Sequence, residues 1–232
     1  MKTKMIELLA GCFVMGAIMA QGAETPDKPG LYLIGDAGAN FIQKTTFKSI
    51  LGSPASMSLD IDPGGRGTIG VGYAFLPTLA AEAELGASYN ESKPFIVGGI
   101  PGNGSLRLWT VPLTLGVTWR PMIPPDKPSD IEAGPRLQQL FQRSRPYIGA
   151  GVGAAEVFAD VDTPGSTLGS QGSGQDTVLA YYLKAGVRLP ITDRIELGLQ
   201  YRFAGNTGFT IKQTKSEEMF AHAVSVAVRF QF

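Results

Sequence analysis

The stretch FAHAVSVAVRFQF, residues 220–232, ends the chain with a bulky side chain at every second position. Successive side chains of a β-strand point to opposite faces, so this alternation predicts a strand with one mainly apolar face. That face would hold Phe220, His222, Val224, Val226, Val228, Phe230 and Phe232. The fold depends on whether such a face lies inside the protein or against lipid.

The same period of two recurs along the chain between stretches rich in Gly, Pro and Ser. It predicts eight strands, at residues 30–43, 66–76, 78–90, 106–120, 146–160, 177–190, 194–205 and 219–232. An even number of alternating strands suits a closed antiparallel barrel.

The polar face of these strands indicates which side is inside. A soluble barrel hides its apolar face in the interior, whereas a membrane barrel turns that face to lipid. Here the polar face carries small residues, which suit the narrow lumen of an eight-stranded barrel and do not suit a water-exposed surface. They are Gly70, Gly72, Gly149, Gly151, Gly153, Gly186 and Gly198.

Two tryptophans support the membrane alternative. Trp109 and Trp119 lie on one apolar face with only apolar side chains between them on that face. Ten residues of a strand tilted by about 40° cover roughly 25 Å, the height of the apolar band between aromatic girdles. We therefore predict an all-β fold, an eight-stranded antiparallel up-and-down transmembrane β-barrel. Its aromatic girdle would comprise Trp109, Trp119, Tyr201, Phe203 and Phe230.

The first residues have the pattern of a signal peptide. Lys2 and Lys4 precede an apolar run at 8–20, and small residues follow, so residues 1–23 are predicted to be removed. The string LAGC ending at Cys12 offers a lipoprotein signal as an alternative, but the apolar run before it is short and contains Glu7. Because Cys12 is the one cysteine, a chain cleaved near Gly22 or Ala23 would have neither disulfides nor thiolate metal sites.

Residues 24–232 are predicted to form the barrel as one domain. Connections at 44–65, 91–105, 161–176 and 206–218 are long, whereas those at 75–78 and 190–194 are tight. Long external loops, short internal turns and two periplasmic termini are typical of an outer-membrane barrel. The Pro-rich segment 121–145 departs from this pattern, and we interpret it as a periplasmic insertion that either packs under the barrel or docks a partner.

Four stretches carry a family resemblance. RPYIGAGVGAA at 145–155, GYAFLPTLAAEAEL at 72–85, GLQYRF at 198–203 and HAVSVAVRFQF at 222–232 resemble the OmpA-like and opacity-protein-like eight-stranded outer-membrane barrels. The resemblance extends over nearly all of residues 30–232. It implies the barrel fold and a role as surface adhesin, envelope stabiliser or small pore. This sequence departs from the family in the long segment at 121–145 and in having no peptidoglycan-binding domain after the barrel.

The end of the chain also resembles the signal that the barrel assembly machinery reads during insertion. Five alternate residues would form it: Val224, Val226, Val228, Phe230 and Phe232.

Charged side chains on the polar face are predicted to lie in the lumen. They are Asp36, Arg66, Glu82, Glu84, Arg120, Lys184, Arg188, Glu196, Arg202 and Arg229. Buried charges need partners, so these residues are expected to form a structural ion-pair network that plugs the lumen. The alternative is a narrow pore whose permeability depends on rearrangement of those pairs.

The sequence offers little catalytic chemistry. Lipid A deacylases on small barrels use a His with a Ser, but the single histidine, His222, and nearby Ser225 have opposite strand parity. Glu82 and Glu84 could form a glycosidase pair only in a lumen open to sugar. No metal or nucleotide motif is present, so we expect no cofactor.

The external loops are unusually apolar. This indicates either a binding surface or loops that pack on one another. The residues are Phe47, Ile50, Leu51 and Met57 in the first loop and Phe95, Ile96, Val97 and Ile100 in the second.

The sequence favours an integral outer-membrane barrel with a structural or surface-interaction (adhesin-like) role and no catalysis. Expected partners are outer-membrane lipid, the barrel assembly machinery and a host or envelope partner at the external loops. The 20 basic and 20 acidic residues cancel, so nucleic acid is not expected. The alternative is a narrow porin for ions or small solutes, followed by a lipid-modifying enzyme and by a soluble secreted barrel.

Overall fold

The computed structural model describes residues 29–43, 45–49, 57–93, 95–97, 100–121, 144–162, 172–211 and 214–232. The predicted signal peptide at 1–23, Ile50, Leu51 and residues 122–143 of the Pro-rich segment lie outside the described residues. So do the side chains of the other apolar loop residues named above.

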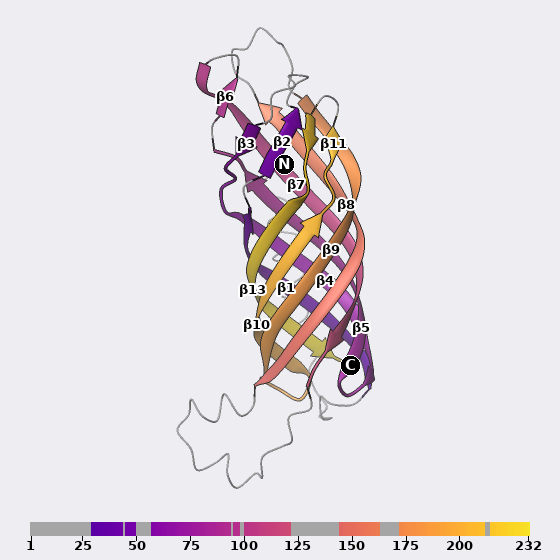
Figure 1. The fold of residues 1–232 in the computed structure, drawn as a ribbon. Coiled ribbons are helices and arrows are strands. Elements are labelled where there is room, and N and C mark those ends of the chain that lie inside the picture. Colours follow the sequence, from indigo (N-terminus) through magenta and orange to yellow (C-terminus); the bar gives the residue numbers. More distant parts are fainter. Residues whose placement is uncertain are drawn as a thin grey trace.

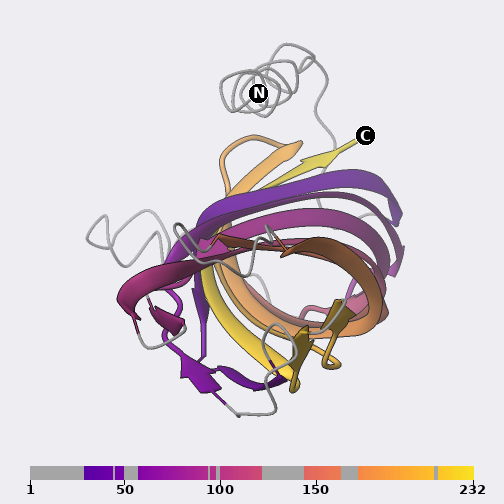
Figure 2. The same ribbon diagram turned by 90° about the horizontal axis from the view of Figure 1, so that it is seen from above.

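Eight long strands form one closed antiparallel barrel, which confirms the predicted fold class (Figures 1 and 2). Each strand pairs with the next in the barrel, and the last pairs with the first from Tyr32 opposite Gln231 to Ile42 opposite Ala221. The strands are β1 (Gly30–Ile42), β4 (Gly64–Leu76), β5 (Leu79–Glu91), β7 (Ile100–Trp119), β8 (Arg145–Asp162), β9 (Gly172–Pro190), β10 (Ile195–Asn206) and β13 (Met219–Gln231).

The two ends of the barrel differ. At one end, here called the turn end, Pro77–Thr78 and residues 191–194 are tight connections, and the C-terminus lies there (Figure 1). At the other, here called the loop end, β7, β8 and β9 continue beyond their predicted limits. Apolar alternation marks only the part of a strand that faces lipid, whereas the hydrogen-bond ladder continues above it.

Five short strands at the loop end were not predicted. Four of them form a second sheet in the order β11-β12-β2-β3, and the fifth, β6, pairs with β7. They are β2 (Thr45–Ser49), β3 (Met57–Leu59), β6 (Phe95–Val97), β11 (Thr210–Ile211) and β12 (Thr214–Ser216). Runs of two to five residues are too short to show a period of two, so the sequence indicated only loops there.

The outer wall of the barrel is apolar. Leu113, Leu115 and Leu199 are each at least 60% exposed. So large an exposed apolar surface suits contact with lipid rather than with water. None of the described residues belongs to a helix long and apolar enough to cross a membrane.

Aromatic rings lie on the same outer wall. Trp119 and Tyr201 are exposed. The Trp109 ring centroid lies 4.7 Å from that of Tyr89, and Phe203 stacks on Phe220 at 5.7 Å. At the turn end Phe230 contacts Phe232 edge to face at 5.3 Å. Val224, Val226 and Phe232 of the C-terminal pattern are also exposed.

Glycines on the inner wall make room for large inward-facing rings. A Cβ atom at Gly72 would lie 2.2 Å from the ring of Tyr32, and one at Gly151 would lie 2.5 Å from the ring of Tyr182. Both tyrosines are buried. The lumen is therefore narrow at these levels because tyrosines fill the space that the glycines leave.

Candidate functional site

The candidate site is the interior of the barrel, where side chains form two layers. The layer nearer the turn end is here called the charged belt. The structure places all ten predicted charged side chains inside: nine are buried residues, and the side chain of Arg66 is 8% exposed. The charged belt comprises Asp36, Arg66, Glu82, Glu84, Arg120, Lys184, Arg188, Glu196, Arg202 and Arg229.

Lys184 of β9 is the centre of the charged belt. Its Nζ donates to Glu84 Oε1 at 2.6 Å and also to Glu82 Oε2. Arg202 from β10 donates to the other oxygen of Glu84. The two glutamates lie two residues apart on β5, so they share one face of that strand and meet the same lysine.

Hydroxyl groups complete the shell around Glu82. The Tyr32 hydroxyl donates to its Oε1 at 2.7 Å, and the Thr118 hydroxyl donates to its Oε2 at 2.6 Å. Tyr182 donates to Glu84 at 3.2 Å. Carboxylates that accept this many bonds are held as structural counter-ions, and neither is arranged as a free acid or base.

A second group of ion pairs lies at the turn end. Glu196 Oε2 is 3.1 Å from Arg229 Nη1, and its Oε1 is 3.3 Å from Arg145 Nη1. Arg145 was not among the predicted luminal residues because the predicted strand begins one residue later, at 146. Its parity with inward-facing Tyr147 was a usable signal, since alternate residues share a face.

Guanidinium groups in the charged belt also stack on tyrosines. Arg188 lies 4.0 Å above the Tyr147 ring, Arg229 lies 4.1 Å above Tyr32, and Arg202 lies 4.1 Å above Tyr182. Cation–π contacts stabilise a buried positive charge without a second carboxylate. Tyr182 shares the strand parity of Lys184, which places it in the lumen, but parity does not indicate which arginine it contacts.

The pairing around Asp36 is looser. Arg66 Nη2 is 3.8 Å from Asp36 Oδ1, too far for a hydrogen bond, and donates instead to Thr68 at 2.6 Å. Gln200 reaches Asp36 Oδ2 at 3.4 Å. The pairing at Asp36 is therefore looser than that at Glu82 and Glu84.

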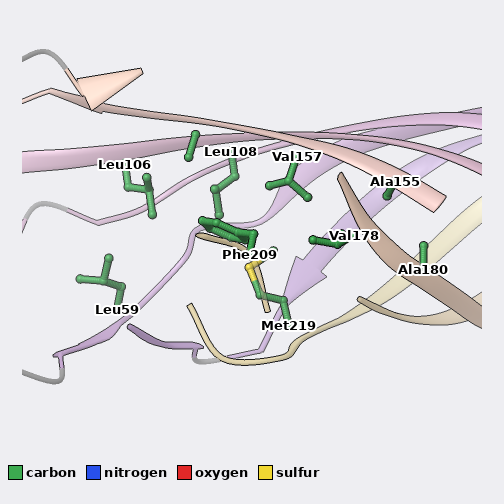
Figure 3. Packing of buried hydrophobic residues seen from close by; sticks show 10 residues of the cluster. Leu59, Leu106, Leu108, Ala155, Val157, Val178, Ala180, Phe209 and Met219 are labelled. Carbon is green, nitrogen blue, oxygen red and sulfur yellow. The ribbon is translucent and has the colours of Figure 1, made fainter. Parts of the chain in front are cut away.

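The second layer, nearer the loop end, is an apolar plug that was not predicted from the sequence. Figure 3 shows Phe209 and Met219 surrounded by aliphatic side chains. Phe209 is fully buried, and its backbone N–H donates to Ser216 Oγ at 3.0 Å. The apolar plug comprises Leu59, Leu106, Leu108, Ala155, Val157, Ala159, Val178, Ala180, Phe209 and Met219.

The parity of the barrel strands could have indicated this layer. Leu106 and Leu108 share the parity of luminal Thr114 and Thr118, and Val157 shares that of Tyr147. Apolar residues on the luminal face were thus visible in the sequence. Phe209 was not predictable, because it comes from a segment with the composition of a loop.

His222 and Ser225 lie on opposite sides of the barrel wall. The His222 ring nitrogens contact Gln43 and the Tyr201 hydroxyl on the outer surface, and its ring packs on Phe203. Ser225 is buried inside. The two side chains therefore do not form a nucleophile and base pair. Among the described residues, no group of three or more His, Cys, Asp or Glu side chains is placed to hold a metal ion.

Two solved structures match nearly the whole of this chain. The outer membrane protein OprG from Pseudomonas aeruginosa matches with a TM-score of 0.53 and 12% identity over 90% of this chain and 100% of OprG. Neisserial surface protein A matches with a TM-score of 0.49 and 17% identity over 91% and 100% of the two chains. At this identity the likeness to OprG shows the fold alone.

Comparison with curated proteins gives no match. A family model described as the outer membrane protein beta-barrel domain matches residues 8–232. This match covers nearly the whole chain and agrees with the closed eight-stranded barrel and its apolar outer wall. The chain belongs to the outer membrane protein β-barrel family.

Proposed function

We propose that this protein is a structural or surface-interacting, adhesin-like barrel that catalyses no reaction. The observation that carries the proposal is that two layers fill the lumen, the charged belt and the apolar plug. Because these two layers close the lumen, the outer wall and the two ends remain for contact with macromolecules. The loop end carries a small sheet of its own, β11-β12-β2-β3, which suits a rigid contact surface.

The orientation is part of the proposal. We place the turn end and both termini in the periplasm and the loop end outside, because short turns face the periplasm in barrels of this kind. The outward C-terminal residues Val224, Val226 and Phe232 support recognition by the barrel assembly machinery. Outer-membrane lipid would contact the apolar wall throughout.

Replacing residues 210–215 with a short Gly-Ser turn tests the surface role, because it removes β11 and most of β12 from the small sheet and keeps Phe209 of the apolar plug. Both forms would be folded, checked by heat-modifiable gel mobility, and exposed to envelope extract and to immobilised extracellular-matrix proteins. We expect the wild type to retain a partner that the variant loses. Retention of the same partners by both forms would contradict a contact surface built on this sheet.

A narrow pore is the second candidate, and the loose pairing around Asp36 favours it. Arg66 approaches Asp36 only to 3.8 Å, and Asp36 Oδ1 has no hydrogen-bond partner in the described part of the chain. Rearrangement of this pair would open space beside it. Conductance steps in planar bilayers that change in size in Glu82→Gln would support the pore, because Glu82 holds Lys184 in place.

A further inference from the structure

A cavity lies inside the barrel between the charged belt and the apolar plug. Its volume is about 80 Å³, measured as space for the centres of water-sized molecules. Its lining includes the belt residues Arg66 and Arg202 and the plug residues Ala155, Ala180 and Met219. The cavity therefore offers both cationic and apolar groups.

The charged side chains of the lining are cationic. Of the described residues that line the cavity, the two charged ones are both arginines, and the belt carboxylates Asp36 and Glu84 are not among them. Six cationic and four anionic side chains make up the charged belt as a whole. Arg202 also pairs with Glu84, and Arg66 lies 3.8 Å from Asp36, but both carboxylates lie outside the lining, so an anion in the cavity would meet the remaining N–H donors of the two arginines.

The lining also contains polar atoms without partners. Arg202 Nε, a donor, and Asn206 Oδ1, an acceptor, are buried and form no hydrogen bond within the described part of the chain. Arg66 forms one hydrogen bond, to Thr68, although a guanidinium has five N–H donors. A buried donor or acceptor without a hydrogen-bond partner is destabilising, because its desolvation is not compensated. Such atoms are therefore expected to bind water or a ligand.

We propose that the cavity binds a short aliphatic monocarboxylate. The carboxylate would lie against Arg66 and Arg202, whose planar groups match its two oxygens, and the hydrocarbon against Ala155, Ala180 and Met219. A buried water needs about 10–15 Å³ of such space, so the cavity matches a ligand of roughly six non-hydrogen atoms. This binding requires no ion conduction and does not depend on the proposed surface role.

The test uses folded wild-type protein in detergent and isothermal titration with butyrate, with 1-butanol and butylammonium as matched probes. We expect saturable binding of butyrate and binding at least about tenfold weaker for the other two, because only butyrate forms charge-assisted bonds to the arginines. Equal binding of all three, or no saturable butyrate binding to the folded protein, would overturn the proposal.

Variants locate the binding. Ala180→Leu places extra atoms in the cavity and should abolish butyrate binding, whereas Ala185→Leu, on the exposed face of the same strand, should leave it unchanged. Arg66→Gln should weaken it at least about tenfold, with Arg107→Gln, an exposed arginine on the outer wall, as the control. Butyrate binding retained by folded Ala180→Leu would place the ligand elsewhere. If Arg66→Gln does not fold, the comparison of Ala180→Leu with Ala185→Leu still tests whether butyrate binds in this cavity.

Discussion

The charged belt and the apolar plug fill one lumen by opposite means. The belt holds buried charges in place through partners distant in sequence, such as Lys184 and Glu84. The plug fills space with aliphatic side chains and with one ring, Phe209, supplied by a loop segment. Removal of a belt partner leaves an uncompensated buried charge, whereas removal of plug atoms leaves a void, so the two layers should respond differently to substitution.

The largest effect is expected at the centre of the belt. Lys184→Met leaves Glu82 without its lysine and Glu84 with Arg202 alone, and should lower the free energy of unfolding by about 3–5 kcal/mol. Urea unfolding in detergent, followed by gel mobility, measures it. Lys215→Met, at an exposed lysine, is the control and should change stability by less than about 0.5 kcal/mol.

A double variant separates charge from packing. Adding Glu82→Gln to Lys184→Met removes the carboxylate that has lost its lysine and should recover part of the lost stability. If the double variant has a lower free energy of unfolding than Lys184→Met alone, the stability of the charged belt does not depend on these ion pairs.

A smaller effect is expected in the plug. Leu108→Ala leaves a cavity among buried side chains and should cost about 3 kcal/mol. Leu115→Ala, on the same strand but facing outward, leaves no internal cavity and should cost less than about 1 kcal/mol. The same unfolding assay compares them, and a larger loss for Leu115→Ala would mean that the two faces of β7 are assigned the wrong way round.

Overpacking near the belt should cost less again. Gly151→Ala brings a Cβ to 2.5 Å from the Tyr182 ring and 2.8 Å from the Leu115 carbonyl oxygen, and should destabilise the barrel by about 1–3 kcal/mol. Gly65→Ala is the matched control, because nothing lies within 4 Å of a Cβ there. Equal unfolding midpoints for the two variants would show that the lumen at Tyr182 is wider than described.

The smallest effect is expected for an ion pair outside the lumen. Arg107 Nε lies 3.5 Å from Glu91 Oε1, and both side chains are more than a third exposed. Arg107→Gln should change stability by about 0.2–1 kcal/mol, and added salt should reduce the difference. A loss comparable to that of Lys184→Met would remove the distinction between buried and exposed pairs on which the comparison depends.

Strand parity made much of this architecture predictable. Leu115 and Gly116 are neighbours, yet one faces outward and the other inward, and the same rule places Glu82, Lys184 and Arg202 in the lumen. Parity does not predict which luminal side chains contact one another. Lys184 meets Glu84 because of the stagger of the strands around the barrel, and stagger is a property of closure rather than of any one strand.

The loop end was hard to predict for a different reason. Phe209 lies in a Gly- and Thr-rich segment without alternation, and only the tertiary fold brings it against Leu106 and Leu108. The short strands β11 and β12 are stabilised by pairing with each other and with β2, so their sequences alone carry no signal. Arg145 was missed by one residue at a strand boundary, where sequence patterns are least informative.

The most direct test of two layers that close the lumen is the conductance of wild-type protein in planar lipid bilayers. We expect an electrically silent membrane after fusion of protein-loaded liposomes with the bilayer. Heat-modifiable gel mobility of the protein in those liposomes verifies that it is folded and inserted. Steady, reproducible conductance steps from the wild type would contradict it, since ions would then pass both the charged belt and the apolar plug.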